Sequence, residues 1–330
     1  MKRILFGVAF ALVCGAAAAG PVCPGKPDAL GVSRELVVGA GEYFRLGKMQ
    51  YRQTLPLADR EVVLTFDDGP LPHYSDRVLD ILAAQCVKAT FFLVGRQARI
   101  DPAAVRRIYN AGHTIGTHSQ NHPLRTMSEP RAGREIDDGI ESVIAALGDA
   151  KALAPFFRVP GLLRTPHIEA QAKARELVVW SADTLADDWR KIGAEQVLHL
   201  ALSRLERKGR GVLLLHDVQP RTVLMLPTLL SELKRRGFKI VHVVPEGERP
   251  VLPQPTMMAS AVKEAWPRVI ASSAPRPPTG SSADAEIATA AERAALSEVL
   301  PPPMRPVRPV RRAAAKPRHV IAIHDLHTAQ

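Results

Sequence analysis

Aromatic side chains are scarce in this sequence of 330 residues, at 5% of the total. A surface that stacks nucleic-acid bases needs several aromatic side chains, and the sequence contains no nucleic-acid-binding motif. The net charge of +11 therefore indicates anionic partners of another kind. We predict no nucleic-acid partner and expect a monomer.

Long apolar runs are also missing after the first residues of the chain. Ile4–Val13 is apolar, follows Lys2 and Arg3, and precedes the small residues Ala17–Ala19. This order is typical of a secretory signal peptide, which we place at residues 1–19. No later run is long enough to cross a bilayer. We therefore expect the mature chain to be exported, either to the periplasm or outside the cell.

Cysteine is rare, with three residues in the chain. Removal of the expected signal peptide leaves Cys23 and Cys86. An oxidising compartment permits a disulfide between them. The sequence leaves this pairing and two free thiols equally open.

Short apolar runs alternate with helical patterns between Glu61 and Val244. We predict three helices, at residues 75–85, 101–112 and 194–209, from apolar residues three and four positions apart. This alternation predicts parallel β/α units, in a barrel of seven or eight strands or in an open doubly wound sheet. The predicted strands are Val62–Phe66, Thr90–Val94, Thr114–His118, Phe156–Val159, Leu177–Ser181, Gly211–His216 and Lys239–Val244.

Residues typical of helix ends support the predicted helix boundaries. Asp101 and Pro102 are typical of an N-cap followed by proline in the first turn. Gly112, Gly209 and Gly237 fall where helix C-caps are expected.

Polar residues follow the predicted strands, and in parallel β/α folds a site lies at the carboxyl ends of the strands. We therefore expect a site among five residues, which are Asp67, His118, Arg158, Asp183 and His216.

The chain divides into four segments by composition. After the signal peptide, residues 20–60 form an irregular approach segment. We expect residues 61–250 to form the domain built from the alternating strands and helices, and residues 251–330 to form a disordered tail rich in Pro, Ala and Arg. Residues 253–330 hold ten Lys and Arg against six Asp and Glu. The basic tail could tether the protein electrostatically to anionic envelope polymers.

Two adjacent acids, Asp67 and Asp68, end a strand in "TFDDGP", and His118 and His122 lie four residues apart in "THSQNH". If the chain turns helical after the second strand, the two imidazoles face the same side. Two imidazoles and a carboxylate form a three-ligand set for zinc. Asp68 is the expected third ligand, which leaves Asp67 free to accept a proton from water. The alternative interpretation of the two acids is structural, with one in a turn and the other capping a helix. His113 is expected to pack or to face solvent.

These residues resemble the polysaccharide deacetylase family, carbohydrate esterase family 4. The segments "FFRVPG", "DTLADDW" and "LLLHD" resemble its three remaining motifs, in order, within residues 60–245. The resemblance implies a distorted (β/α) barrel of about seven parallel strands. It also implies metal-dependent hydrolysis of N-acetyl groups on an amino-sugar polymer, such as peptidoglycan, a chitin-like chain or poly-N-acetylglucosamine.

The resemblance also implies a role for each matching residue. Asp67 would be the general base, held by Arg158, and His216 the general acid. The acid that orients His216 would be Asp188, with Asp183 and Asp187 as alternatives. The Gly161 N–H, after Pro160, would bind the oxyanion. Leu214 would line the acetyl pocket and Trp189 the groove. The metal ligands would be Asp68, His118 and His122.

One departure from the family pattern affects the substrate. The family commonly has an aromatic residue where Gly161 stands, so one wall of the sugar groove is absent. Two alternative functions stay open, an exported O-acetyl esterase of the xylan type and a non-catalytic, metal-dependent glycan-binding protein. The ligand set suits Zn²⁺, and Co²⁺ or Ni²⁺ would also fit.

Overall fold

The computed structural model describes residues 23, 25–125 and 127–252. The predicted signal peptide and residues 253–330 of the predicted tail lie outside these residues. Within them, no helix is both long enough and apolar enough to pass through a membrane.

All seven predicted strands are present, and every strand pairing in the described residues is parallel. β3 is buried at each of its seven positions, as expected for a parallel strand covered on both faces. The strands are β3 (Glu61–Asp67), β4 (Thr90–Leu93), β5 (Thr114–Thr117), β6 (Phe156–Arg158), β7 (Val178–Trp180), β9 (Gly211–His216) and β10 (Lys239–Pro245).

Three further strands were not predicted. The segment expected to be irregular contributes β1 (Arg34–Val38), which pairs with β10, and β2 (Arg45–Leu46), which pairs with β7. The prediction of an irregular segment is therefore wrong at these two places. β8 (Thr184–Leu185) pairs with β9. β2 and β8 contain two residues each, so they depend on their partner strands rather than on a local pattern.

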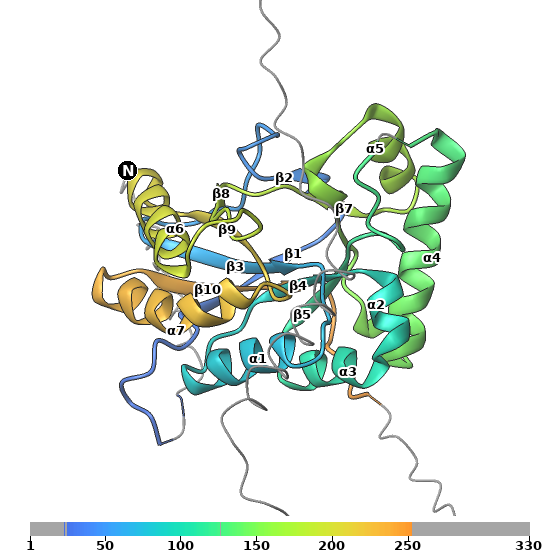
Figure 1. The fold of residues 1–330 in the computed structure, drawn as a ribbon. Coiled ribbons are helices and arrows are strands. Elements are labelled where there is room, and N and C mark those ends of the chain that lie inside the picture. The colour runs from blue at the N-terminus through green and yellow to red at the C-terminus, as the bar shows by residue number, and fades with distance from the viewer. Residues whose placement is uncertain (1–22, 24, 126, 253–330) are drawn as a thin grey trace, which may run out of the picture. The chain divides into compact units, whose positions relative to one another are not determined.

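Helices surround the strands (Figure 1). α6 packs on α7, α7 on α1, α1 on α3, α3 on α4, and α4 on α5. The helices are α1 (Tyr74–Ala84), α2 (Gly95–Ile100), α3 (Pro102–Asn110), α4 (Glu129–Leu147), α5 (Pro166–Lys173), α6 (Ala194–Lys208) and α7 (Pro220–Arg235).

The predicted helix ends are confirmed. Asp101 accepts a hydrogen bond of 2.8 Å from the Ala104 N–H at the start of α3. Gly112, Gly209 and Gly237 each follow a helix with positive φ, at +88°, +73° and +74°. These left-handed positions favour glycine because it lacks a Cβ.

The strands form an incomplete barrel, which decides between the two predicted architectures. β3 has β9 along one side, and on the other side it pairs with β10 at its first residues and with β4 at its last. The sheet continues from β4 through β5, β6 and β7 to β2, and from β9 to β8. Among the described strands β2 and β8 do not pair with each other, so the barrel is open there.

One disulfide joins Cys23 to Cys86, with 5.7 Å between the Cα atoms. It links the segment before β1 to the turn after α1. The structure thus settles a pairing that the sequence left open.

Candidate active site

Asp67 is the last residue of β3 and is buried, with 2% of its surface exposed. Its Oδ1 atom lies 2.6 Å from the Arg158 Nη1 atom. The fully buried Arg158 also donates to the Thr65 hydroxyl at 2.9 Å and to the Ser181 carbonyl at 3.0 Å. Arg158 therefore holds Asp67 in one orientation, as the resemblance implied.

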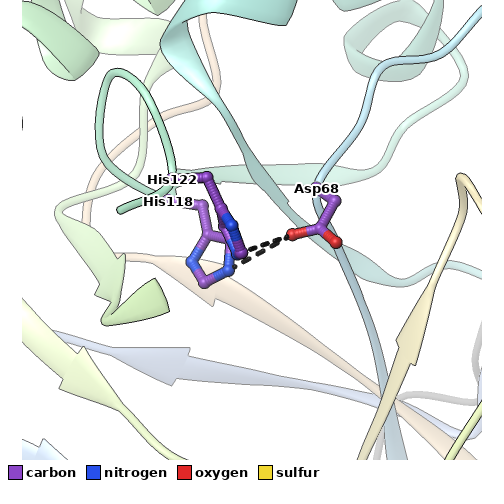
Figure 2. Close-up of side chains that lie close together, drawn as sticks. All are labelled: Asp68, His118 and His122. Carbon is purple, nitrogen blue, oxygen red and sulfur yellow. Dashed lines mark ion pairs between the residues drawn. The ribbon is translucent and has the colours of Figure 1, made fainter. Parts of the chain in front are cut away.

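Asp68 departs from the strand conformation, with φ at +80°. Its Oδ1 atom lies 3.1 Å from the His122 Nε2 atom and 3.5 Å from the His118 Nε2 atom (Figure 2). Burial alone would raise the pKa of Asp68, but the imidazoles of His122, His216 and His118 hold this pKa well below its usual range. The carboxylate is therefore ionised and faces two imidazoles.

His118 follows β5 directly, and its Nδ1 atom lies 2.7 Å from the Arg158 carbonyl oxygen. A carbonyl oxygen only accepts, so Nδ1 carries the proton and Nε2 presents a lone pair toward Asp68. Burial lowers the pKa of His118 to about 4, which favours the neutral imidazole. A neutral imidazole is the form that binds a metal.

His122 reaches the same point by a different local structure from the one we predicted. Residues 118–122 contain no helix. Instead Ser119 and His122 have positive φ, at +63° and +53°, and the Ser119 hydroxyl accepts from the His122 N–H at 3.1 Å. This tight turn brings the two imidazole rings to 4.8 Å between centroids. The convergence is confirmed, whereas the helical spacing proposed for it is wrong.

These three side chains fit a metal ion. Their candidate ligand atoms all lie within 4.8 Å of one another. Two ligands about 2.1 Å from a tetrahedral zinc ion lie roughly 3.4 Å apart, close to the separations between Asp68 and the two imidazoles. The Asp68 Oδ1 atom is buried and has no hydrogen-bond partner among the described residues, so a cation would satisfy it.

His216 ends β9, and its Nε2 atom lies 4.0 Å from Asp68 Oδ2. Its Nδ1 atom lies 2.7 Å from Asp188 Oδ1, and the other Asp188 oxygen accepts from the His216 N–H at 2.7 Å. Burial alone would lower the pKa of His216, but the Asp188 carboxylate raises this pKa to about 10. His216 therefore carries a proton on the nitrogen that faces the acid pair.

The structure distinguishes among the three acids that the sequence left open. Asp188 is fully buried against His216. Asp187 instead pairs with Arg204 at 2.9 Å and with Arg190 at 3.2 Å.

Asp183 lies at the other end of β9. It accepts at 2.8 Å from the N–H of Val212, near the start of β9 and four residues before His216. The prediction that Asp183 belongs to the site is therefore wrong, because the chain after β7 returns to the opposite end of β9.

The predicted groove residues lie at different depths. Trp189 is half-buried and meets the His216 ring edge-on at 5.6 Å between centroids. Leu214 is buried two residues before His216, so it points to the same side of β9. Pro160 is buried, and Gly161 is exposed with φ at +57°. A Cβ on Gly161 would lie 2.9 Å from the Leu124 side chain, so a larger residue here would need Leu124 to move.

Sequence reasoning missed several supporting residues. Thr65 lies two residues before Asp67, so strand alternation could have placed it beside Arg158. Thr222 donates to Asp188 at 2.6 Å from α7, which was not among the three helices predicted from apolar spacing. Asp217 is buried and accepts from the Ser75 hydroxyl. Its carboxylate lies where a Cβ on Gly69 would be, which explains the glycine after the acid pair.

His113 lies outside the site. It is buried, and its Nδ1 atom accepts from the Ala89 N–H at 3.1 Å. It also packs edge-on against Phe91. Of the two roles expected for His113, packing and facing solvent, the structure shows packing.

An acid pair, two imidazoles and an imidazole–carboxylate pair meet at the carboxyl ends of parallel strands. These are the groups of a hydrolytic active site on an α/β barrel.

Comparisons with known proteins agree with this class. The polysaccharide deacetylase family matches residues 55–180. A chitooligosaccharide deacetylase of Bradyrhizobium is 34% identical over 205 residues, which cover 57% of this chain and 90% of that protein. A peptidoglycan-N-acetylglucosamine deacetylase of Bacillus cereus is 30% identical over 200 residues, which cover 57% and 89% of the two proteins. The chain belongs to the polysaccharide deacetylase family.

A solved structure shows the same likeness. A peptidoglycan deacetylase of Bdellovibrio bacteriovorus is 31% identical, with a TM-score of 0.59. The match covers 66% of this chain and 60% of that protein.

Proposed function

We propose that the protein hydrolyses N-acetyl groups on an amino-sugar polymer of the chitooligosaccharide or peptidoglycan type, with metal assistance. The observation that carries the proposal is the division of the acid pair. Asp67 is paired with Arg158, whereas Asp68 faces two imidazoles. The names of the relatives in Bradyrhizobium and Bacillus cereus support the substrate class.

Asp68, His118 and His122 would hold the metal. A divalent cation at this position supplies the positive charge that polarises an acetyl carbonyl and lowers the pKa of water toward ~7. Two nitrogens and one oxygen suit Zn²⁺, and they also allow Co²⁺ or Ni²⁺.

Asp67 and His216 divide the proton transfers. Asp67 accepts a proton from the attacking water, because its carboxylate ligates nothing in this arrangement. Arg158 keeps that carboxylate oriented. The Gly161 N–H stabilises the oxyanion. His216, oriented by Asp188, gives its Nε2 proton to the departing nitrogen, which leaves acetate and a free amine.

The pocket for the acetyl methyl group would be formed by Leu214, which is buried beside His216 on β9. Trp189 would form part of the wall for the sugar chain, because it is half-buried at the ring of His216.

Export is part of the proposal. The Cys23–Cys86 disulfide supports it, because disulfides persist in oxidising compartments.

Acetate release from N-acetylglucosamine oligomers tests the function, with acetylated xylan as the comparison substrate. We expect release from the oligomers, loss of release with a chelator, and recovery on addition of Zn²⁺. Glycan binding without acetate release would leave only a binding role, and faster release from xylan would favour an esterase.

Asp67→Asn and Asp68→Asn separate the two roles of the acid pair. Asp67→Asn should keep bound metal and lose turnover by about 10²- to 10⁴-fold, because it removes the base. Asp68→Asn should lose both turnover and bound metal, because it removes a metal ligand. Elemental analysis reports metal content independently of activity. An active Asp67→Asn protein would overturn the assignment of the base.

A further inference from the structure

A pocket lies at the opposite end of β9 from His216. It has a volume of about 450 Å³, and its lining includes Lys48, Leu55–Leu57, Asp183, Lys208 and Arg210. Gly211, the first residue of β9, also lines it. Roughly 16 Å of strand separates Gly211 from His216, at about 3.3 Å per residue. The pocket shares no residue with the site described above.

Three exposed cations converge on this pocket, and backbone carbonyls hold each of them. The Lys48 ammonium donates to the Arg52 carbonyl at 2.6 Å, and the Arg210 guanidinium donates to the Leu57 carbonyl at 2.8 Å. The Lys208 ammonium donates to the Asp183 carbonyl. None of the three forms a salt bridge with any residue in the described part of the chain. A carbonyl positions a cation without neutralising its charge.

The one acid in the pocket lining is already engaged. Asp183 is 4% exposed, and its Oδ1 atom accepts from the Lys48 N–H at 2.8 Å. Its Oδ2 atom accepts from the Thr54 hydroxyl and the Val212 N–H, each at 2.8 Å. These three donors fix Asp183 as a structural acid that joins the 48–54 segment to β9. Three cations therefore surround one carboxylate, and the pocket keeps an excess of positive charge.

We propose that this pocket binds an acidic sugar, through a carboxylate or phosphate group carried on a glycan chain. The planar guanidinium of Arg210 can pair with both oxygens of such a group, and the two ammonium groups supply further charge-assisted donors. Leu55–Leu57, with Pro56 exposed, offers an apolar wall for the carbon face of a sugar ring. The volume lies in the range of small-molecule sites. The proposal does not depend on the proposed hydrolysis, because the two sites share no residue.

Binding of trigalacturonate to the full chain tests this site, because the trisaccharide carries three carboxylates and no acetyl group. Titration calorimetry would compare the parent protein with the triple variant Lys48→Gln, Lys208→Gln, Arg210→Gln. A matched control removes the same charge from exposed residues elsewhere, with Arg99→Gln, Arg131→Gln and Lys151→Gln. Inorganic phosphate and neutral chitotriose complete the set of probes.

We expect the triple variant to lose trigalacturonate affinity by about tenfold or more and the control variant to stay within about twofold of the parent. Inorganic phosphate should compete with the trisaccharide, and chitotriose should not. Equal losses in the pocket and control variants would show a general charge effect and overturn the proposal. Phosphate binding without trigalacturonate binding would overturn the acidic sugar.

If the triple variant does not fold, Lys48→Gln alone tests the same point. Circular dichroism checks the fold of each variant. Parent-like affinity in a folded Lys48→Gln and a folded Arg210→Gln would overturn the proposal.

Discussion

The backbone conformation of one residue, Asp68, brings both adjacent acids to His118. Neighbouring residues of a strand point to opposite faces, and Asp67 shares its face with Thr65 and Arg158. The left-handed φ of Asp68 turns its carboxylate toward the imidazole of His118, which Asp67 also faces. His118 Nε2 thus lies 3.8 Å from Asp67 and 3.5 Å from Asp68. Aspartate adopts this conformation more readily than most residues.

At the residue scale, His216→Ala should distinguish amide from ester hydrolysis. An amine is a poor leaving group without a proton, whereas an alcohol leaves more easily. We expect turnover of an N-acetyl substrate to fall by about 10²-fold or more and turnover of an O-acetyl ester to fall much less. Acetate release from both substrates measures the ratio. Equal losses on the two substrates would contradict a general-acid role for His216.

At the scale of elements, the long apolar strands were predictable because a parallel strand covered on both faces is apolar throughout. β3 and β9 are examples, with nearly every position buried. β2 was not predictable, because its two residues are held by β7 rather than by their own pattern.

Within the site, too, the sequence predicted some residues and could not place others. The sequence pointed to Asp67, Asp68 and Arg158 because they follow apolar runs, and to His118 and His122 because they lie four residues apart. It could not choose between Asp187 and Asp188, because a turn with φ of +59° at Asp187 decides which acid faces His216. It also placed Asp183 wrongly, because the direction of the chain after β7 is set by pairing with β9.

His113, directly before β5, should make the stability of the protein sensitive to acid. Burial lowers the pKa of His113 well below its ordinary value, so the folded state keeps this imidazole neutral. The unfolded chain takes up a proton below about pH 6.5. The stability that His113 contributes is therefore complete above that pH and is lost as the pH falls below it.

His113→Asn isolates this effect. Asparagine can keep an acceptor for the Ala89 N–H but does not titrate. Between pH 7.5 and 5.5 the parent should lose about 1.4 kcal/mol more of its free energy of unfolding than the variant. Urea denaturation at the two pH values measures the difference. Parallel losses in both proteins would show that His113 does not govern the acid response.

At the scale of the whole molecule, the disulfide should be a main source of stability. It joins residues 63 positions apart, so its loss frees a long loop in the unfolded chain. Reduction should lower the free energy of unfolding by about 2–5 kcal/mol. Denaturation with and without reductant measures this change. The double variant Cys23→Ser, Cys86→Ser is the control and should not respond to reductant. A parent protein that is equally insensitive would refute the prediction.

The three-way pairing of β3 has a consequence for motion. Three neighbouring strands hold it, so its amides can exchange with solvent deuterium only when several strands separate together. The amides of Val62 to Asp67 should then be among the slowest in the protein, and those of β2 among the fastest strand amides. The Asp67 carboxylate would therefore lie on a strand that rarely opens, while the strand β2 at the open side of the barrel opens often.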